Sequence, residues 1–333
     1  MRYRTILGLS AALVVACTGR LATGVPLDST SPSGGGTSSQ AAPSTAGQTV
    51  SPIASQAEDV LVGGDRPVTV QVPAGYEPGR PAPLLIVLHG YGSSGQDHDA
   101  YFHLGQAAQQ RGFLYVYPDG TFDSDWSRFW NATDACCDFD RTGVADVAYL
   151  ANVITEIRGS FAVDPKRVYL IGHSNGGFMS YAMACAHADL IAAMVSLAGA
   201  TFANPAKCSP TVPVAVLEIH GTADDTILFK GGTIEGLGSG RSIAPYPGAQ
   251  TSVATWAKYD GCATSSIVDE HVDVDADLGE AGAPAEASVT RWTGCRPGGA
   301  VELWTMPGGG HAPNISEAFP KAVLDFVEAH PKP

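Results

Sequence analysis

Charged residues, and cations above all, are scarce in this chain. Only 16% of its 333 residues are charged, and 19 Lys and Arg stand against 33 Asp and Glu, which gives a formal net charge of −14. This deficit of cations argues against binding to nucleic acid or to anionic membrane surfaces. The hydrophobic fraction of 44% is sufficient for a large core, and a single α/β domain can accommodate a chain of this length.

Long hydrophobic runs are also missing beyond the first residues, and no later segment reaches transmembrane length. The apolar run from Ile6 to Ala16 follows Arg2 and Arg4 and is too short to span a bilayer. This combination predicts a signal peptide over residues 1–17. We therefore expect the protein outside the cytoplasm, either secreted or in the cell envelope.

The signal run ends in Leu13-Val14-Val15-Ala16-Cys17, which resembles the lipobox of bacterial lipoproteins. In that interpretation Cys17 receives lipid and is the protein's only link to a membrane. An ordinary cleaved signal peptide with an incidental cysteine is the alternative. Residues 18–57 are rich in Ser, Thr, Gly, Pro and Ala, a composition that cannot form a core and predicts a disordered tether. Residues 58–333 remain as the predicted folded domain.

The most informative motif is Gly172-His173-Ser174-Asn175-Gly176. An apolar, β-branched run over 168–171 precedes it and residues 178–184 can form a helix, so the motif has the strand–turn–helix context of a nucleophile elbow. The glycines permit a strained turn that exposes the Ser174 hydroxyl at the start of the helix. This position predicts nucleophilic catalysis by Ser174, provided that a base and an acid lie nearby.

Candidates for that base and acid follow the nucleophile in the order Ser, Asp, His that this architecture uses. A buried strand over 212–219 leads to Asp224, and another over 300–306 leads through three glycines to His311. Each residue comes shortly after a strand, where open α/β sheets place ligands. We therefore expect Asp224 to orient His311, with the adjacent Asp225 as the alternative acid.

An oxyanion hole is expected after an earlier strand, because backbone N–H groups there can stabilise a tetrahedral intermediate. The near-continuous apolar run over 83–88 is typical of a strand buried on both faces, and it ends in a Gly-rich loop that contains Tyr91. We expect the N–H groups of Tyr91 and Asn175 to be the two donors. Three histidines in these turns are interpreted as structural: His89, His173 and His220.

Four motifs give the chain a resemblance to the polyhydroxybutyrate depolymerase and feruloyl esterase group of α/β-hydrolases, which is similar to carbohydrate esterase family 1. These motifs are HGYGSSG, GHSNGGFMS, HGTADD and GGGH, and the likeness runs from about Val60 to His330. The resemblance implies an α/β-hydrolase fold and a serine esterase that needs no cofactor. It also implies Ser174, Asp224 and His311 as the triad, with Tyr91 in the oxyanion hole.

The remaining pattern predicts the α/β class as well. Segments typical of strands lie at 68–72, 113–118 and 191–197, and segments with helical character lie at 102–111, 147–157 and 319–329. Alternation of strands and helices indicates a doubly wound, mostly parallel sheet with helices on both faces.

Six cysteines remain besides Cys17: Cys136, Cys137, Cys185, Cys208, Cys262 and Cys295. An even number behind an export signal predicts disulfide bonds. We expect Cys262 to pair with Cys295 around the polar insert between them. The other expected bonds join Cys136 and Cys137 to Cys185 and Cys208, with a bond between Cys136 and Cys137 as the alternative. None of the spacings predicts a zinc site.

Aromatic residues cluster in the loop 119–140. Trp126 and Trp130 are candidates to stack on a phenolic acid or a sugar, and packing of each ring onto the protein is the alternative. The Asp-rich run 269–277 does not fit a calcium loop, because Leu278 stands where an EF-hand needs Gly. The sequence therefore predicts no metal and no other cofactor.

Together with the resemblance, these features predict a secreted serine carboxylester hydrolase with a Ser-His-Asp acyl-enzyme mechanism. Its expected substrates are feruloyl, acetyl or polyhydroxybutyrate-type esters, polymeric ones included. We expect a monomer. The alternative is a surface-anchored, non-catalytic protein that binds a polymer or glycan, because a fold alone does not determine function.

Overall fold

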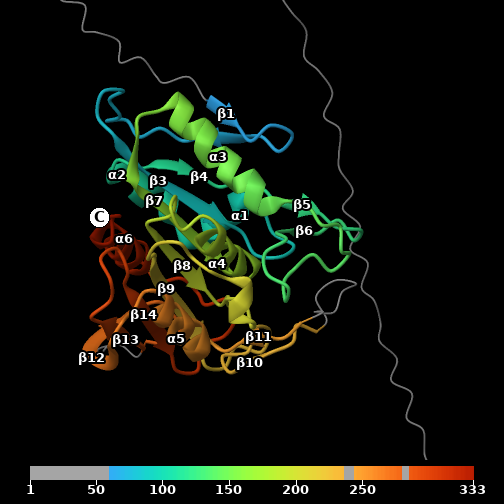
Figure 1. Ribbon diagram of the computed structural model, residues 1–333, viewed down its shortest axis with the longest axis vertical. Coiled ribbons are helices and arrows are strands. Elements are labelled where there is room, and N and C mark those ends of the chain that lie inside the picture. The colour runs from blue at the N-terminus through green and yellow to red at the C-terminus, as the bar shows by residue number, and fades with distance from the viewer. Residues whose placement is uncertain (1–59, 236–243, 280–284) are drawn as a thin grey trace, which may run out of the picture. The chain divides into compact units, whose positions relative to one another are not determined.

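The computed structural model describes residues 60–235, 244–279 and 285–333 (Figure 1). The predicted signal peptide, Cys17 and the predicted tether over 18–57 lie outside the described residues. None of the helices in the described ranges has both the length and the apolar character that a membrane span requires.

An eight-stranded sheet forms the centre of the fold. Its strands are β3 (Ala82–Leu88), β4 (Leu114–Val116), β7 (Val163–His173), β8 (Ala193–Leu197), β9 (Ala215–Gly221), β12 (Thr264–Val272), β13 (Ala287–Thr293) and β14 (Val301–Met306). They are ordered β12-β13-β14-β9-β8-β7-β3-β4. Neighbours from β14 to β4 are parallel, whereas β13 is antiparallel to both β12 and β14. The carboxyl ends of β3, β7, β9 and β14 therefore lie along the same edge of the sheet.

Helices cover both faces of this sheet (Figure 1). One face carries α3 (Asp146–Ser160), α4 (Asn175–Ala186) and α5 (Ala249–Tyr259), and the other carries α1 (Gly95–Phe102), α2 (Leu104–Gln110) and α6 (Phe319–Ala329). Side chains of β3 alternate between the two cores, with Leu84 and Ile86 in one and Leu85 and Val87 in the other. The predicted doubly wound, mostly parallel sheet is confirmed.

Short elements complete the described part of the chain: β1 (Val60–Val62), β2 (Val68–Val70), β5 (Thr121–Phe122), β6 (Arg128–Phe129), β10 (Gly231–Gly232), β11 (Tyr246–Pro247) and the 3-10 helix η1 (Pro205–Lys207). The strands pair as β1–β2, β5–β6 and β10–β11, each antiparallel. The strand predicted at 68–72 thus pairs mainly with β1. An isolated bridge between Gln71 and Tyr115 joins it to β4.

The helix predicted over 102–111 differs from the structure. Helix α1 begins earlier, where the Ser94 hydroxyl accepts a hydrogen bond from the Asp97 N–H, and the chain breaks at His103, whose φ is 55°. A capping serine and one left-handed residue therefore replace a single helix with two short ones.

Cys262 pairs with Cys295, as predicted. This disulfide joins the start of β12 to the end of β13, since the two cysteines flank the ends of these paired strands. It therefore closes the antiparallel hairpin at the edge of the sheet that lies farthest from β3 and β4.

The predicted bonds of Cys136 and Cys137 with Cys185 and Cys208 are wrong. Cys185 bonds to Cys208, and Cys136 bonds to its neighbour Cys137, which was the alternative. The sulfur of Cys136 lies 3.5 Å from the side-chain nitrogen of Asn175, at the first turn of α4. Cys185 belongs to the last turn of that helix, roughly 15 Å farther along at 1.5 Å per residue, which is too far for a disulfide.

Candidate active site

Ser174 lies at the sharp turn between β7 and α4, with φ 54° and ψ −119°. Such a conformation costs of order 1–3 kcal/mol for a residue other than glycine, so its surroundings must hold it. The Ser174 N–H donates to the Leu197 carbonyl (2.8 Å), and the Ser174 carbonyl accepts from the Phe178 N–H (3.0 Å). A β-carbon on Gly176 would lie 2.1 Å from the Leu88 carbonyl oxygen, so only glycine lets α4 approach β3 this closely.

The side chains of Ser174, His311 and Asp224 form one hydrogen-bonded chain. His311 Nε2 lies 2.9 Å from Ser174 Oγ, and His311 Nδ1 lies 2.9 Å from Asp224 Oδ2. The parallel pairing of β9 with β14 brings the loops after these strands together. In this arrangement Nδ1–H donates to Asp224 while Nε2 accepts from the serine hydroxyl, which is the geometry of an activated nucleophile.

Asp224, rather than the adjacent Asp225, contacts His311. Asp224 is buried and Asp225 is exposed. The second oxygen of Asp224 accepts hydrogen bonds from the N–H groups of Thr226 (2.9 Å) and Ile227 (2.8 Å). Burial alone would raise the pKa of Asp224, but hydrogen bonds with His220 and His311 outweigh it and lower that pKa. The carboxylate therefore stays ionised beside His311.

The loop after β3 lies directly against the nucleophile. A β-carbon on Gly90 would be 3.5 Å from the β-carbon of Ser174. The N–H groups of Tyr91 and Asn175, the two residues that flank this contact, have no hydrogen-bond acceptor within the described ranges. Asn175 also begins α4, so the positive end of the helix dipole is directed at the same place. The role of these two N–H groups as oxyanion donors stays a prediction.

His89 and His173 make fixed contacts beside the nucleophile. His89 Nδ1 lies 2.7 Å from the Gly90 carbonyl, and its Nε2 accepts from the Gly120 N–H (2.9 Å). Burial lowers the pKa of His89 to about 4, so the ring is neutral. His173 Nε2 lies 2.9 Å from the His311 carbonyl oxygen, and its Nδ1 lies 3.1 Å from His98 Nε2. These contacts fit the structural interpretation of both residues.

Trp130 is fully buried, so it cannot contact a substrate, and its prediction as a substrate-binding residue is wrong. Its indole N–H donates to the His89 carbonyl (3.1 Å), and its ring stacks on Tyr149. Its backbone instead holds Asn175: the Trp130 N–H donates to Asn175 Oδ1 (2.7 Å), and Asn175 Nδ2 donates to the Trp130 carbonyl (2.9 Å). The sequence contained no signal for this reciprocal pair, because the two residues are far apart in the chain.

Trp126 lies in the turn of the β5–β6 hairpin, and its side chain is 80% exposed. The ring of Phe122, also exposed, lies 5.9 Å away between centroids. This hairpin is attached to the loop after β3 by a hydrogen bond from the Gly92 N–H to the Arg128 carbonyl (2.8 Å). The two rings therefore form an exposed aromatic surface on an element joined to the loop of Tyr91, and the role of Trp126 stays a prediction.

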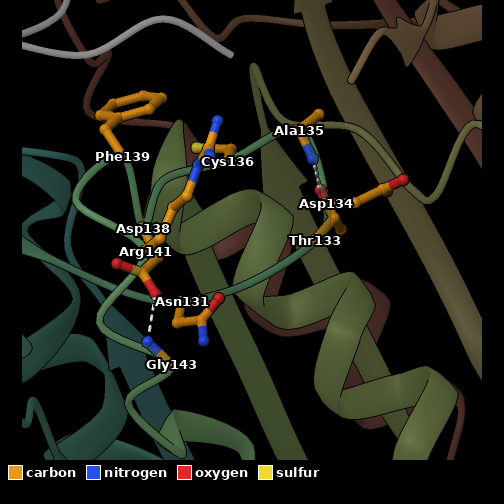
Figure 2. Close-up of a pocket in the computed structure, with 9 residues that line it drawn as sticks. All are labelled: Asn131, Thr133, Asp134, Ala135, Cys136, Asp138, Phe139, Arg141 and Gly143. Atoms are coloured by element: carbon orange, nitrogen blue, oxygen red, sulfur yellow. Dashed lines mark hydrogen bonds between the residues drawn. The ribbon is translucent and has the colours of Figure 1, made fainter. Parts of the chain in front are cut away.

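A cavity of about 330 Å³ lies beside this hairpin, lined by residues between Asn131 and Gly143 (Figure 2). Figure 2 shows the Arg141 side chain extending along it toward Cys136. Two contacts connect its wall to residues near Ser174: the Phe139 ring packs on Tyr91 (5.5 Å between centroids), and Cys136 Sγ lies 3.5 Å from the Asn175 side chain. Two wall residues of the cavity thus contact the side chains of Tyr91 and Asn175, which do not themselves line it.

Comparison with known proteins shows which family the chain resembles. The family model Esterase matches residues 60–282. The chain is 31% identical over 270 residues to feruloyl esterase B of Piromyces equi, covering 79% of this chain and 45% of that protein. It is 30% identical over 169 residues to a bifunctional acetylxylan esterase/xylanase of Neocallimastix patriciarum, covering 50% and 23% respectively. The chain thus spans less than half the length of these two relatives.

Solved structures show the same architecture. An acetyl xylan esterase from Aspergillus awamori matches with a TM-score of 0.54 at 15% identity, covering 79% of this chain and 94% of that one. A thermostable esterase matches with a TM-score of 0.51 at 11% identity, covering 82% and 63%. At these identities the likeness concerns the fold alone, and it agrees with the predicted α/β-hydrolase fold.

Proposed function

The chain belongs to the esterase family, and from this premise we propose that it is a serine carboxylester hydrolase. The observation that carries the proposal is the unbroken set of hydrogen bonds from Ser174 through His311 to Asp224, 2.9 Å at each step. It lies at the carboxyl edge of a parallel sheet, where this fold places its chemistry.

In the first half of the reaction, Ser174 Oγ attacks the ester carbonyl carbon while His311 Nε2 accepts the hydroxyl proton. The N–H groups of Tyr91 and Asn175 donate to the resulting oxyanion, and Asp224 stabilises the imidazolium. The bond between the former carbonyl carbon and the alkoxy oxygen then breaks, and His311 gives its proton to that oxygen, so that the alcohol leaves. An acyl-enzyme on Ser174 remains.

In the second half, a water molecule attacks the acyl-enzyme and His311 accepts a water proton. Collapse of this second tetrahedral intermediate returns the proton to Ser174 and releases the carboxylic acid. Every step uses groups of this chain and water, so the proposed reaction requires no cofactor.

For the substrate we favour feruloyl or acetyl esters of a polysaccharide over polyhydroxybutyrate-type esters. The printed names of two relatives, a feruloyl esterase and an acetylxylan esterase/xylanase, support this choice. The exposed rings of Trp126 and Phe122 could stack on a phenolic acid or on sugar rings.

The test is hydrolysis of p-nitrophenyl acetate, butyrate and octanoate beside methyl ferulate, with Ser174→Ala as the control. We expect the wild-type protein to hydrolyse these esters, with methyl ferulate or the acetate preferred. The Ser174→Ala variant should hydrolyse none of them. Preference for butyrate over both would favour the polyhydroxybutyrate-type substrate. If no ester were turned over in a Ser174-dependent way, the esterase proposal would fail in favour of a binding protein.

The proposed setting is extracytoplasmic, with export by residues 1–17 and a lipid anchor on Cys17. The three disulfides support an oxidising compartment. Radiolabelled palmitate should enter the full-length protein in a bacterial host but not its Cys17→Ala variant. Equal labelling of the two proteins would rule out this anchor.

A further inference from the structure

Two ionisable side chains lie buried in the middle of the central sheet. Glu218 and His220 belong to β9 and are two residues apart, so both point to the same face. They are 0% and 1% exposed. Burying such groups without partners costs several kcal/mol, and the steps proposed above use neither of them. Their contacts therefore call for an explanation.

With Glu218 ionised, the polar neighbours of the His220 ring in the described residues are all hydrogen-bond acceptors. Nδ1 lies 2.9 Å from Glu218 Oε1, and Nε2 lies 2.7 Å from the Ile227 carbonyl oxygen and 3.3 Å from Asp224 Oδ2. An imidazole between acceptors on both sides satisfies them only if each nitrogen carries a proton. This arrangement therefore favours the imidazolium form.

The surrounding charges also favour a proton on the ring. Burial by itself lowers the pKa of His220, but hydrogen bonds to Asp224 and Glu218 outweigh it and raise that pKa to about 10. The ionisable groups that face the pair in the described ranges are Asp224 from the following loop and Tyr181 from α4, whose hydroxyl donates to Glu218 Oε2 (3.1 Å). Burial raises the pKa of Glu218, and its hydrogen bonds with His220, Ser196 and Tyr181 act in the opposite direction.

In the described residues, the pair contacts the candidate active site through one oxygen of Asp224. Asp224 Oδ2, which lies 3.3 Å from His220 Nε2, is also the acceptor for His311 Nδ1 at 2.9 Å. One carboxylate oxygen is thus held between two imidazole rings. The direction of Oδ2 decides where the His311 ring points, so a positive charge 3.3 Å away on its far side can set that direction.

We infer that His220 is a positioning residue: a buried cation, balanced by Glu218, that holds Asp224 in the place from which it orients His311. The inference rests on the proposed esterase function. It explains why the sheet tolerates a buried Glu–His pair directly beneath the catalytic acid. It also predicts that turnover depends on the charge of His220 and not on its volume alone.

The kinetic test uses His220→Gln in the full chain, because Gln keeps a donor near Asp224 but cannot carry charge. We expect kcat to fall by roughly 10- to 100-fold, as for a small displacement of a catalytic group, with KM nearly unchanged. The acid limb of kcat/KM should move to higher pH, because loss of a nearby cation makes protonated His311 more favourable.

The control is Tyr149→Phe. Tyr149 belongs to α3, and the substitution removes its hydrogen bond to the Arg66 carbonyl (2.7 Å). It should lower Tm without changing kcat or the acid limb. If folded His220→Gln behaved in the same way, with only a lower Tm, the positioning role would be overturned. A fall in kcat together with the shifted limb supports it.

A second measurement does not depend on turnover. In ring-15N histidine spectra, His220 should be protonated on both nitrogens at pH 8, and the His311 Nδ1 proton should give a low-field signal that His220→Gln weakens. If the wild type hydrolysed no ester, the proposed function would fail while these signals still tested the inference. A neutral His220, or a His311 signal unchanged by the substitution, would overturn it.

Discussion

The Tyr91 hydroxyl donates a hydrogen bond to the carboxylate of Asp123, which ties the loop after β3 to the β5–β6 hairpin. The other oxygen of Asp123 accepts from the N–H groups of Asp125 (2.9 Å) and Ser127 (2.8 Å), so the hairpin turn is itself fixed. The Tyr91 side chain thus anchors the loop that carries the backbone N–H of Tyr91.

Tyr91→Phe removes this anchor and keeps the ring against Phe139. A hydrogen bond to a charged group contributes about 1.5–3 kcal/mol. Because only part of this acts on the backbone N–H, kcat should fall by roughly 3- to 10-fold with little change in KM. Tyr76→Phe is the matched control, since its hydroxyl accepts from the N–H of Ala162 (2.7 Å), which precedes the amino end of β7. Steady-state kinetics on one ester measures kcat for the wild type and both variants. Equal kcat in all three proteins would mean that the anchor does not act on the oxyanion hole.

Asp224 and Asp225 offer a sharper comparison, because they are adjacent and chemically identical. Asp224→Asn leaves the shape but removes the charge that fixes the His311 tautomer, and kcat should fall by up to about 10⁴-fold. Asp225→Asn changes an exposed side chain and should retain wild-type kcat. Comparable losses in both variants would contradict the role given to Asp224.

Two glycines near the nucleophile should respond differently to the same added methyl group. Gly176→Ala places a β-carbon 2.1 Å from the Leu88 carbonyl oxygen, so we expect the free energy of unfolding to fall by about 1–3 kcal/mol or more. At Gly90 the new contacts, 3.4–3.5 Å to His173 and Ser174, are ordinary. Gly90→Ala should therefore fold normally and keep close to wild-type activity. Thermal unfolding and kinetics of both variants test this, and the reverse pattern would refute it.

Local patterns predicted much of this molecule. The helix expected over 319–329 matches α6, and the strand–turn–helix context of Ser174 is found between β7 and α4. Chain order also brings Asp224 and His311 to the same edge of the sheet, because β9 and β14 are parallel neighbours. Short-range periodicity and turn chemistry are sufficient for such features.

What local patterns could not predict depends on contacts between distant segments. The burial of Trp130 follows from its place above Tyr149 and His89, and nothing in its own loop indicates it. The pairing of Cys185 with Cys208 likewise depends on where α4 ends. A charged residue in an apolar strand was the available signal for Glu218, but its partner His220 was interpreted as a turn residue alone.

The Cys262–Cys295 disulfide should stabilise the protein without affecting its chemistry. It closes the β12–β13 hairpin at the sheet edge, five strands from β7. Cys262→Ser with Cys295→Ser should therefore lower the free energy of unfolding by about 2–4 kcal/mol and leave kcat unchanged at a temperature where the variant is folded. Denaturant unfolding checks the first point, and a changed kcat would show that this edge reaches the active site.

Asp260 makes the stability of the fold depend on pH. It is fully buried at the end of α5; Oδ1 accepts from the Val214 N–H (3.2 Å), and Oδ2 has no partner in the described ranges. Burial raises the pKa of Asp260 to about 7, although Val214, Arg296 and Lys332 act in the opposite direction. In the unfolded chain the same carboxyl titrates near pH 3.9.

Between about pH 4 and pH 7, the unfolded state therefore releases a proton that folded Asp260 retains, so stability falls as pH rises through this window. Asp260→Asn keeps the neutral shape and removes the titration. Its Tm should equal that of the wild type near pH 4 and exceed it at pH 8, where the wild type must ionise a buried carboxyl at a cost of about 2–4 kcal/mol. Calorimetric scans of both proteins at the two pH values measure this difference. A variant that lay below the wild type at pH 8 would show that Asp260 is ionised and stabilised in the folded state by Arg296 and Lys332.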